Sequence, residues 1–363
     1  MKRSMLIMVM AMLAGAAANA DDWDRRQAMN AITPHDYLCY QAGGEVTIDG
    51  RLDDAAWQNA PWTEFFQDIE GEKKPLPLQD TRAKMLWDDQ YFYVGAWLEE
   101  QHVWGTLTKR DSVIFYDNDF EIFIDPDGDT HEYFEIEINA LNTVWDLFLA
   151  KPYKDGGPPD NSWDIEGLKT AVHVAGTLND YRDIDRYWSV EFAIPWDAFP
   201  LRDPDVEPPQ DGDQWRVNFS RVQWQHVIEE RRYQKVPNTP EFNWVWSPQG
   251  IIDMHRPEKW PIVQFTTAQP GRGEFRPDQT QPARQVLFDL YYQQRDHRRA
   301  HGQWAEAIDS LDLRYDQDAF AAGPVINATT GGYQAWVTLP TNEGLKKVTI
   351  RHDALLKVQA AEE

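Results

Sequence analysis

Residues 115–139, FYDNDFEIFIDPDGDTHEYFEIEIN, contain two stretches in which apolar and polar side chains alternate. The alternation runs through 120–125 and again through 133–139, with the period of two that is typical of a half-buried β-strand. The turn-forming residues Pro-Asp-Gly-Asp at 126–129 separate the two stretches. The sequence therefore predicts a β-hairpin with one apolar face and one face rich in carboxylates.

The polar face of this hairpin carries Glu121, Glu135, Glu137 and Asn139. Carboxylates on neighbouring strands repel each other and destabilise a sheet. A sheet that retains them usually has something for them to bind or to pair with. We therefore take this face as the first candidate for a binding site.

Short apolar segments separated by Pro, Gly and Asp continue on both sides of the hairpin, up to residue 265. Their regular spacing predicts an all-β fold, in which two antiparallel sheets pack as a jelly-roll-like β-sandwich. The composition then changes: 283–313 has the apolar spacing of a helical hairpin, and 333–350 that of a short strand pair. The expected organisation is a sandwich at 21–266, a linker at 267–282 that is rich in Pro, Gly and Gln, and a C-terminal extension with helical and β parts at 283–363.

The first twenty residues have the pattern of a secretory signal peptide. Lys2 and Arg3 precede an apolar run at 5–17, and Ala18-Asn19-Ala20 is a small-residue cleavage site. Nothing later in the chain approaches the length of a membrane span. We expect a secreted or periplasmic protein, and Cys39, the single cysteine, excludes an intrachain disulfide.

Charge and aromatic content narrow the function further. The 363 residues include 60 Asp and Glu against 35 Lys and Arg, a formal net charge of -25. So acidic a chain argues against nucleic acid or an anionic membrane as the partner, because both require clustered cations. This net negative charge is also compatible with bound cations. The 17 Trp exceed what packing alone needs, as in secreted proteins that stack on sugars.

The tryptophans divide into groups by their local sequence. Trp244 and Trp246 are two residues apart and share one side of a strand, so they form either an exposed stacking platform or part of the core. Trp104 and Trp145 are not assigned. The tryptophans assigned to the core, because they lie within apolar segments, are Trp57, Trp87, Trp97, Trp196 and Trp215.

With these segments laid out, the chain resembles the family 9 carbohydrate-binding modules over about residues 45–265. The matching segments, in order, are VTIDGRLDDAAW (46–57), AKMLWDDQYFYVGAW (83–97), DNDFEIFIDPDGD (117–129), YFEIEINAL (133–141), YWSVEFAIPWDAF (187–199), GDQWRVNFSRV (212–222) and NWVWSPQG (243–250). The resemblance implies a β-sandwich that binds sugar without catalysis and often holds calcium.

The resemblance also implies a binding site. An aromatic clamp would come from Trp244 or Trp246 on one side and from Phe115 or Tyr116 on the other. The polar contacts of the family come from the face that carries Glu121, Glu137 and Asn139, although the best-known members have Arg where this chain has Glu137.

A calcium site is the second implication. Hard cations require several oxygen ligands. Glu99, Glu100, Asp117 and Asp119 lie near the metal-binding region of the family, and we expect them to supply those ligands.

Two other functions stay open beside the sugar-binding module. Glu121, Glu135 and Glu137 on neighbouring strands would lie roughly 5 Å apart, the carboxylate spacing of a retaining glycoside hydrolase. Related sandwiches bind a b-type haem through Met and His or Lys, and the available residues are Met85, Met254, His131, His173 and His255. We interpret the chain as a non-catalytic secreted protein that binds a saccharide, with a C-terminal extension that can recruit a protein partner.

Overall fold

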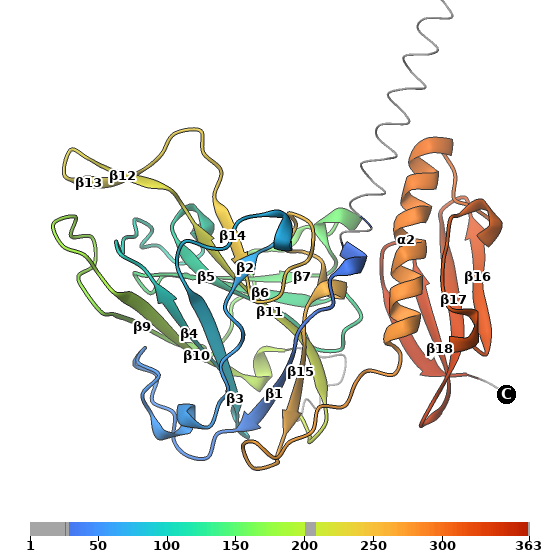
Figure 1. Cartoon of the computed structure of the whole chain (residues 1–363), viewed down its shortest axis with the longest axis horizontal. Helices are drawn as coiled ribbons and strands as arrows, with labels where there is room; N and C mark the ends of the chain where they lie inside the picture. The colour runs from blue at the N-terminus through green and yellow to red at the C-terminus, as the bar shows by residue number, and fades with distance from the viewer. Residues whose placement is uncertain (1–25, 27–28, 200–207, 362–363) are drawn as a thin grey trace, which may run out of the picture. The chain divides into compact units, whose positions relative to one another are not determined.

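The computed structural model describes residues 26, 29–199 and 208–361 (Figure 1). The chain forms two compact units, one of residues Pro34–Arg276 and one that combines Pro277–Glu363 with the residues up to Thr33. The predicted signal peptide lies outside the described residues. Among the residues described, no helix is long and apolar enough to cross a membrane.

The larger unit is a β-sandwich, so the predicted all-β fold is confirmed (Figure 1). Its strands are β1 (Asp36–Gln41), β2 (Gln67–Asp68), β3 (Thr81–Trp87), β4 (Tyr91–Glu99), β5 (Asp119–Asp125), β6 (Tyr133–Asn139), β7 (Val144–Leu149), β8 (Pro159–Asp160), β9 (Lys169–Val174), β10 (Tyr187–Pro195), β11 (Gln214–Gln223), β12 (His226–Glu229), β13 (Arg232–Lys235), β14 (Phe242–Val245) and β15 (Ile262–Thr266). Short 3-10 helices are η1 (Ala55–Gln58), η2 (Gly71–Lys73), η3 (Ile114–Tyr116), η4 (Tyr153–Asp155), η5 (Trp196–Ala198) and η6 (Pro257–Lys259).

The two layers of the sandwich belong to one curled sheet. Layer A consists of β8, β7, β6, β5, β11 and β15 in that order, with β14 also paired to β11, and layer B consists of β1, β3, β4, β10 and β9. Strand β1 runs parallel to β15 on one side and to β3 on the other, and so joins the layers. The sheet is therefore mixed, whereas the sequence predicted two separate antiparallel sheets.

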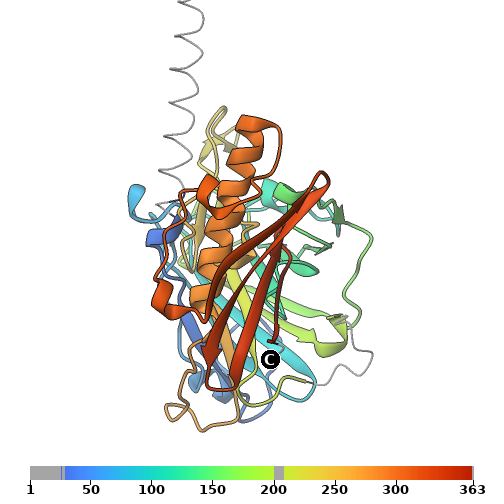
Figure 2. The ribbon, with the colours of Figure 1, turned by 90° about the vertical axis from the view of Figure 1, so that its right-hand side faces the viewer.

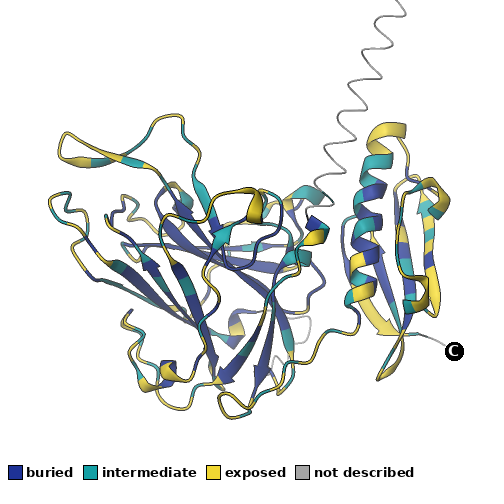
Figure 3. Cartoon of the chain, viewed as in Figure 1, coloured by how far each residue is buried: buried dark blue, intermediate teal, exposed yellow. Residues whose placement is uncertain are grey.

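The apolar face of the central hairpin forms the core between the layers, as predicted. Phe120, Ile122 and Ile124 of β5 are buried there with Phe134, Ile136 and Ile138 of β6. The ring of Phe120 lies 6.2 Å from that of Phe192, which comes from β10 in layer B. Figure 3 shows the strands of both layers as largely buried, while the β12–β13 hairpin is exposed.

Part of the outer face of layer B is covered by the segment that precedes β2. Glu191 on β10 accepts hydrogen bonds from the backbone N–H groups of Asp49 and Gly50 and from Nε1 of Trp57. A Cβ atom at Gly95 on β4 would come within 3.2 Å of the Trp57 ring, so the absence of a side chain there lets the indole lie directly on the strand. This contact gives the IDGRLDDAAW segment a structural role.

The smaller unit has its own core. Helix α2 (Gln281–His301) packs against a four-stranded antiparallel sheet (Figures 1 and 2). The strands are β16 (Ala322–Thr329), β17 (Gly332–Thr341), β18 (Gly344–Arg351) and β19 (Leu356–Ala360). Along the chain, the short 3-10 helices η7 (Ile308–Ser310) and η8 (Gln317–Ala319) follow α2 and precede β16. Leu287, Leu290 and Tyr291 of α2 are buried against Val337 and Ile350 of the sheet.

The predicted helical hairpin is wrong. The helix ends at Gly302, whose φ of 77° is a left-handed conformation that stops a helix and that glycine adopts without strain. Ile308 and Leu311, which the apolar spacing assigned to a second helix, instead lie in and just after a short 3-10 turn. There they pack against the core of this unit. A large apolar residue that packs from a turn gives the same spacing as one that packs from a helix.

Candidate functional site

The carboxylate face of the central hairpin is buried, although the sequence predicted a face open to a ligand. Glu121 is 6% exposed, and Asp119, Glu135 and Glu137 are less exposed still. A second small core covers this outer face of layer A. In it, Phe123, Tyr133 and Trp145 from the strands pack against Ile114 from η3 and against Trp260.

The carboxylates of the acid face, which we define as Asp119, Glu121, Glu135 and Glu137, lie close together. Glu121 and Glu137 are directly opposite each other on β5 and β6. Carboxylate oxygens of Asp119, Glu121 and Glu137 all lie within 4.8 Å of one another. The retaining-hydrolase spacing that the sequence suggested for Glu121 and Glu137 is therefore compatible with their positions.

Burial favours the protonated form of these acids. It raises the pKa of Asp119, Glu135 and Glu137 well above the usual range, and the neighbouring carboxylates raise it further. Burial also raises the pKa of Glu121 to about 7, although a hydrogen bond with Ser220 opposes the shift. The environment of this face therefore favours the neutral, protonated form of its acids over the charged form.

Four buried polar atoms at this face have no hydrogen-bond partner in the structure. They are Oδ2 of Asp119, Oε2 of Glu135, Nε1 of Trp145 and Nδ2 of Asn118. Glu135 and Trp145 both neighbour Glu137, which pairs with Trp145 across β6 and β7. Because buried polar groups in folded proteins are almost always hydrogen-bonded, acceptors and donors that remain unpaired indicate a place for a polar ligand or water.

An aromatic rim lies beside the acids. The backbone N–H of Phe115 donates to Oε2 of Glu137 at 2.9 Å, and the rings of Phe115 and Tyr116 are 4.9 Å apart. Tyr116 is 55% exposed. The Nζ atom of Lys235 lies 3.5 Å from the centre of the Trp224 ring and 5.5 Å from that of Tyr116. The structure therefore brings the predicted Phe115 and Tyr116 next to the predicted Glu137.

His255 and two tyrosines line the same face. The hydroxyl of Tyr133 and Nδ1 of His255 are 2.9 Å apart, and Nε2 of His255 is 3.9 Å from Oε2 of Glu135. Burial lowers the pKa of His255 to about 4, so its ring is neutral at physiological pH and does not balance the acids. The ring of Tyr153, which is 42% exposed, lies 4.3 Å from the His255 ring.

Asn139, predicted to contact a sugar, has no hydrogen-bonding capacity left. Its Nδ2 donates to the carbonyl of Leu107 and to Asp117, and its Oδ1 accepts from the backbone N–H groups of Leu141 and Thr143. These four bonds use both donors and both acceptor positions of the amide. Asn139 therefore stabilises the turn after β6 and is not available to a ligand.

The prediction that Trp244 and Trp246 form an exposed stacking platform is wrong. Both side chains are almost completely buried and belong to the core between the layers. Strand β14 pairs with β11 on one edge and with β2 on the other, which encloses it within the sheet. Trp246 stacks on Phe219, and its Nε1 donates to Glu64. The core alternative that the sequence left open for these residues is the one that the structure adopts.

Most of the other assigned tryptophans lie where the sequence predicted, with one exception. Trp57, Trp87, Trp196 and Trp215 are buried. Trp97 is half-buried on the outer face of layer B, because its neighbours Ala96 and Leu98 point into the core. The assignment of Trp97 to the core is therefore wrong.

The four predicted calcium ligands do not form a cluster. Glu100 pairs with Arg221 at 3.2 Å, and Glu99 accepts a hydrogen bond from the backbone of Asp80. The Asp117 carboxylate accepts from Thr106, Leu107 and Asn139 and is fully used. Asp119 alone of the four joins a group of close carboxylates, and its neighbours there are Glu121 and Glu137.

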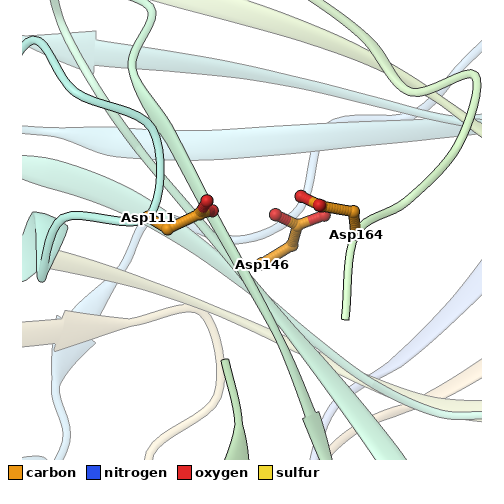
Figure 4. Close-up of side chains that lie close together, drawn as sticks. All are labelled: Asp111, Asp146 and Asp164. Atoms are coloured by element: carbon orange, nitrogen blue, oxygen red, sulfur yellow. The ribbon is translucent and has the colours of Figure 1, made fainter. Parts of the chain in front are cut away.

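Two further aspartate groups are explained by local structure. Figure 4 shows Asp111, Asp146 and Asp164 with their carboxylates near one another. The Arg110 guanidinium pairs with all three, at distances of 2.6 Å to Asp146, 3.0 Å to Asp164 and 3.7 Å to Asp111. In the other group, Asp125 accepts the backbone N–H groups of residues 128 and 130, and so stabilises the predicted turn between β5 and β6.

The sulfur atoms considered for haem ligation have other environments. Met85 is fully buried in the core between the layers. The sulfur of Met254 accepts a hydrogen bond from Gln249.

Sequence reasoning did not select several residues of this face. Trp145 could have been found, because 144–149 alternates and Trp145 lies one strand away from Glu137 in the predicted sheet. Tyr153 lies in η4, Trp224 directly follows β11, and His255 lies in the loop before η6. No local sequence pattern connects these residues to the hairpin. Their positions follow from the tertiary fold.

Comparisons with known proteins point to one family. Residues 48–208 match the family described as carbohydrate family 9 binding domain-like. Over this stretch the chain is similar to that family. The stretch contains β3 to β10 and the whole acid face. The resemblance predicted from the sequence is thereby confirmed.

Individual relatives are distant. Over 159 residues, 44% of this chain, the sequence is 28% identical to exoglucanase XynX of Acetivibrio thermocellus, and the match spans 12% of that protein. A Bacteroides uniformis protein described as a candidate carbohydrate-binding protein is 14% identical, with a TM-score of 0.49 over 64% of this chain and all of that one. A family 9 carbohydrate-binding module from Caldicellulosiruptor kristjanssonii in complex with cellotriose is 16% identical, with a TM-score of 0.39 over 66% of this chain and all of that one.

Proposed function

We propose that the family 9-like domain binds a saccharide at the acid face of layer A. The observation that carries the proposal is the set of buried atoms without partners, Oδ2 of Asp119, Oε2 of Glu135 and Nε1 of Trp145. Sugar hydroxyls both donate and accept, so they match a face that offers acceptors and a donor together. The family description of this stretch supports the same ligand class.

The rim residues supply the second element of a sugar site. Apolar C–H faces of a sugar ring stack on flat aromatic side chains. Tyr116 is exposed beside Phe115, and Phe115 is hydrogen-bonded to Glu137. In this proposal the ring stacks on Tyr116 and Phe115 while its hydroxyls reach Glu121 and Glu137.

Calcium is a further part of the proposal, and of the four ligands first expected only Asp119 is kept. Asp119, Glu121 and Glu137 offer oxygens within 4.8 Å of one another, and Asp119 is fully buried with one oxygen unpartnered. A hard cation accepts several carboxylate oxygens and would remove the repulsion between them. Calcium should then bind more tightly as the pH rises, because the protons held by these acids are released.

Binding without turnover is the proposed activity. A retaining hydrolase needs one ionised nucleophile beside its protonated acid. Burial raises the pKa of every acid-face carboxylate, that of Glu121 to about 7, and so disfavours the ionised nucleophile. We also propose that the chain is exported with cleavage before Asp21, and that the C-terminal unit recruits a protein partner. An intact-mass measurement of the exported protein tests the cleavage, and co-purification with and without residues 277–363 tests the partner.

Calorimetric titration of the mature protein with glucose, cellotriose and a panel of other oligosaccharides tests the proposal, with and without calcium. We expect a sugar that binds the wild type to lose at least about tenfold in affinity in Glu121→Gln and in Trp145→Phe, because each change removes one hydrogen bond to a charged or buried group. The matched control is Asp164→Asn, which removes an exposed carboxylate from the same layer.

The controls separate binding from the other functions. Equal losses in Asp164→Asn and Glu121→Gln would contradict a site at the acid face. Release of reducing sugar that stops in Glu121→Gln would favour the hydrolase instead. Absence of sugar binding together with a calcium-dependent rise in melting temperature would leave cation binding as the role of these acids.

A further inference from the structure

The outer face of layer B carries a second cluster of partly exposed aromatic side chains, and its strands are far from the acid face in the sheet order. Trp97 on β4 and Tyr187 on β10 have ring centres 5.7 Å apart. Arg82 on β3 is directly opposite Trp97. Trp62 and Phe65 come from the segment that runs beside β3, and Phe65 is 47% exposed.

The cluster is organised around one guanidinium group. The Arg82 guanidinium lies 4.2 Å from the centre of the Trp62 ring, 5.3 Å from that of Phe65 and 5.8 Å from that of Trp97. Segment 63–66 is fixed beside β3 by backbone bonds from Thr63 to Ala83 and from Phe66 to Thr81. These rings are therefore held by the sheet rather than by a free loop.

The fold leaves this region open while it covers the rest of the same face. Trp57 and its segment lie over Gly95 and bind Glu191, one step along the strands from Trp97. Trp97, Tyr187 and Trp62 remain half-buried instead. Large aromatic residues that a fold leaves uncovered on one half of a face, while it buries the other half, are a candidate binding surface.

Arg82 has no carboxylate partner among the described residues, and its buried Nε makes no hydrogen bond. Arg186, which lies 5.8 Å from the Tyr187 ring, likewise has no ion pair with an acid in the part of the chain that the structure describes. Elsewhere in the same unit Arg110, Arg221 and Arg276 do pair with carboxylates. In a chain with 60 acidic residues against 35 basic ones, an arginine without an acid is available for an external anion.

We propose that this surface, defined as Trp62, Phe65, Arg82, Trp97 and Tyr187, binds a saccharide that carries carboxylates, such as a uronic acid unit of a glycan. The aromatic rings accept the C–H face of the sugar. The guanidinium of Arg82 forms a two-pronged, charge-assisted hydrogen bond with the carboxylate, which a neutral sugar cannot offer. A peptide carboxylate would satisfy Arg82 but would leave the row of rings unused.

Room for a longer chain lies next to Trp62. A pocket of about 470 Å³ is lined by Trp62 together with Asn59, Glu64 and Phe275. A glycan held at Arg82 can continue past Trp62 toward this pocket. The surface shares no residue with the acid face, so the inference does not depend on the function proposed there.

Calorimetric titration of the full mature protein with trigalacturonate and, as the matched neutral probe, cellotriose tests the inference. We expect trigalacturonate to bind the wild type. In Arg82→Met its affinity should fall by at least about tenfold, because this change keeps the aliphatic part of the side chain but removes the guanidinium group. Arg82→Lys should restore only part of the loss, and Trp97→Ala should lose as much as Arg82→Met. High salt should weaken the wild-type interaction.

Variants at the other face distinguish the two sites. Glu121→Gln should leave trigalacturonate affinity unchanged, whatever it does to cellotriose. If Arg82→Met does not fold, the exposed Arg186→Gln takes its place and should weaken trigalacturonate binding. Unchanged affinity in these arginine variants, loss of trigalacturonate binding in Glu121→Gln, or equal affinity of this surface for cellotriose would each overturn the inference.

Discussion

The two outer faces of the sandwich differ in a way that their strands do not reveal. On layer A, acids on β5 and β6 are covered by η3 and by the segment around Trp260, and several of their polar atoms lack partners. On layer B, aromatic residues and Arg82 stay half-exposed beyond the edge of the covering segment that contains Trp57. One face therefore buries polar carboxyl groups, and the other leaves aromatic rings partly exposed.

The difference shows that the segments packed over each outer face, more than the composition of the strands, decide whether that face is buried or exposed. Both layers alternate in the same manner, and both direct their aliphatic residues into the shared core. Polar atoms without partners inside the fold and aromatic rings left outside it are each unfavourable for a protein alone. Each face thus retains features that a ligand would compensate.

The largest expected effect comes from uncovering the closed half of layer B. Trp57→Ala removes a fully buried indole and leaves Glu191 without one of its donors. We expect a loss of about 3–5 kcal/mol in the free energy of unfolding. Trp97→Ala on the open half is the matched control and should cost no more than about 1 kcal/mol. Urea unfolding of the purified variants measures both, and equal losses would remove the distinction between the halves.

A smaller effect should appear at the acid face, where the free energy of unfolding should depend on pH. The folded-state pKa of Glu121 is about 7, above its usual value, because burial disfavours the charged form. Its contribution to stability is complete below the ordinary carboxylate pKa and is lost as the pH rises through 7. Relative to Glu121→Gln, the wild type should therefore lose on the order of 2 kcal/mol in the free energy of unfolding between about pH 5 and about pH 8.

Unfolding curves at the two pH values provide that measurement. Parallel pH profiles of the wild type and Glu121→Gln would mean that the carboxylate is already ionised and solvated in the folded protein. Trp97→Ala serves as the control here too, since it changes the other face and removes no titratable group. Its pH profile should follow that of the wild type.

The smallest stability effect should come from Arg82→Met. The Arg82 side chain is only partly buried, and its guanidinium lies over aromatic rings, so we expect a loss of about 1 kcal/mol or less in the free energy of unfolding. A melting temperature close to that of the wild type, together with lost binding of an acidic sugar, would distinguish a ligand-binding arginine from a structural one. A loss as large as that of Trp57→Ala would instead assign Arg82 to the fold.

Much of the fold could be predicted from local patterns. The alternation in 120–125 and 133–139 correctly separated Phe120, Ile122 and Ile124, which are in the core, from Glu121, which is on the opposite face. The site was predictable only in part. Phe115 and Glu137 are brought together as the resemblance implied, while Trp244 and Trp246 fill the core, since strand pairing on both edges of β14 was not visible in the sequence.

The sequence by itself determined the strands, the central hairpin and the side of it on which the acids lie, because strand periodicity is a property of neighbouring residues. The tertiary structure alone decided what covers each side. Residues 107–115 and the segment around Trp260 are far from each other in the chain, yet they meet over the acid face. Burial, the raised pKa values and the open aromatic surface around Arg82 all depend on such contacts between distant segments, which no local pattern encodes.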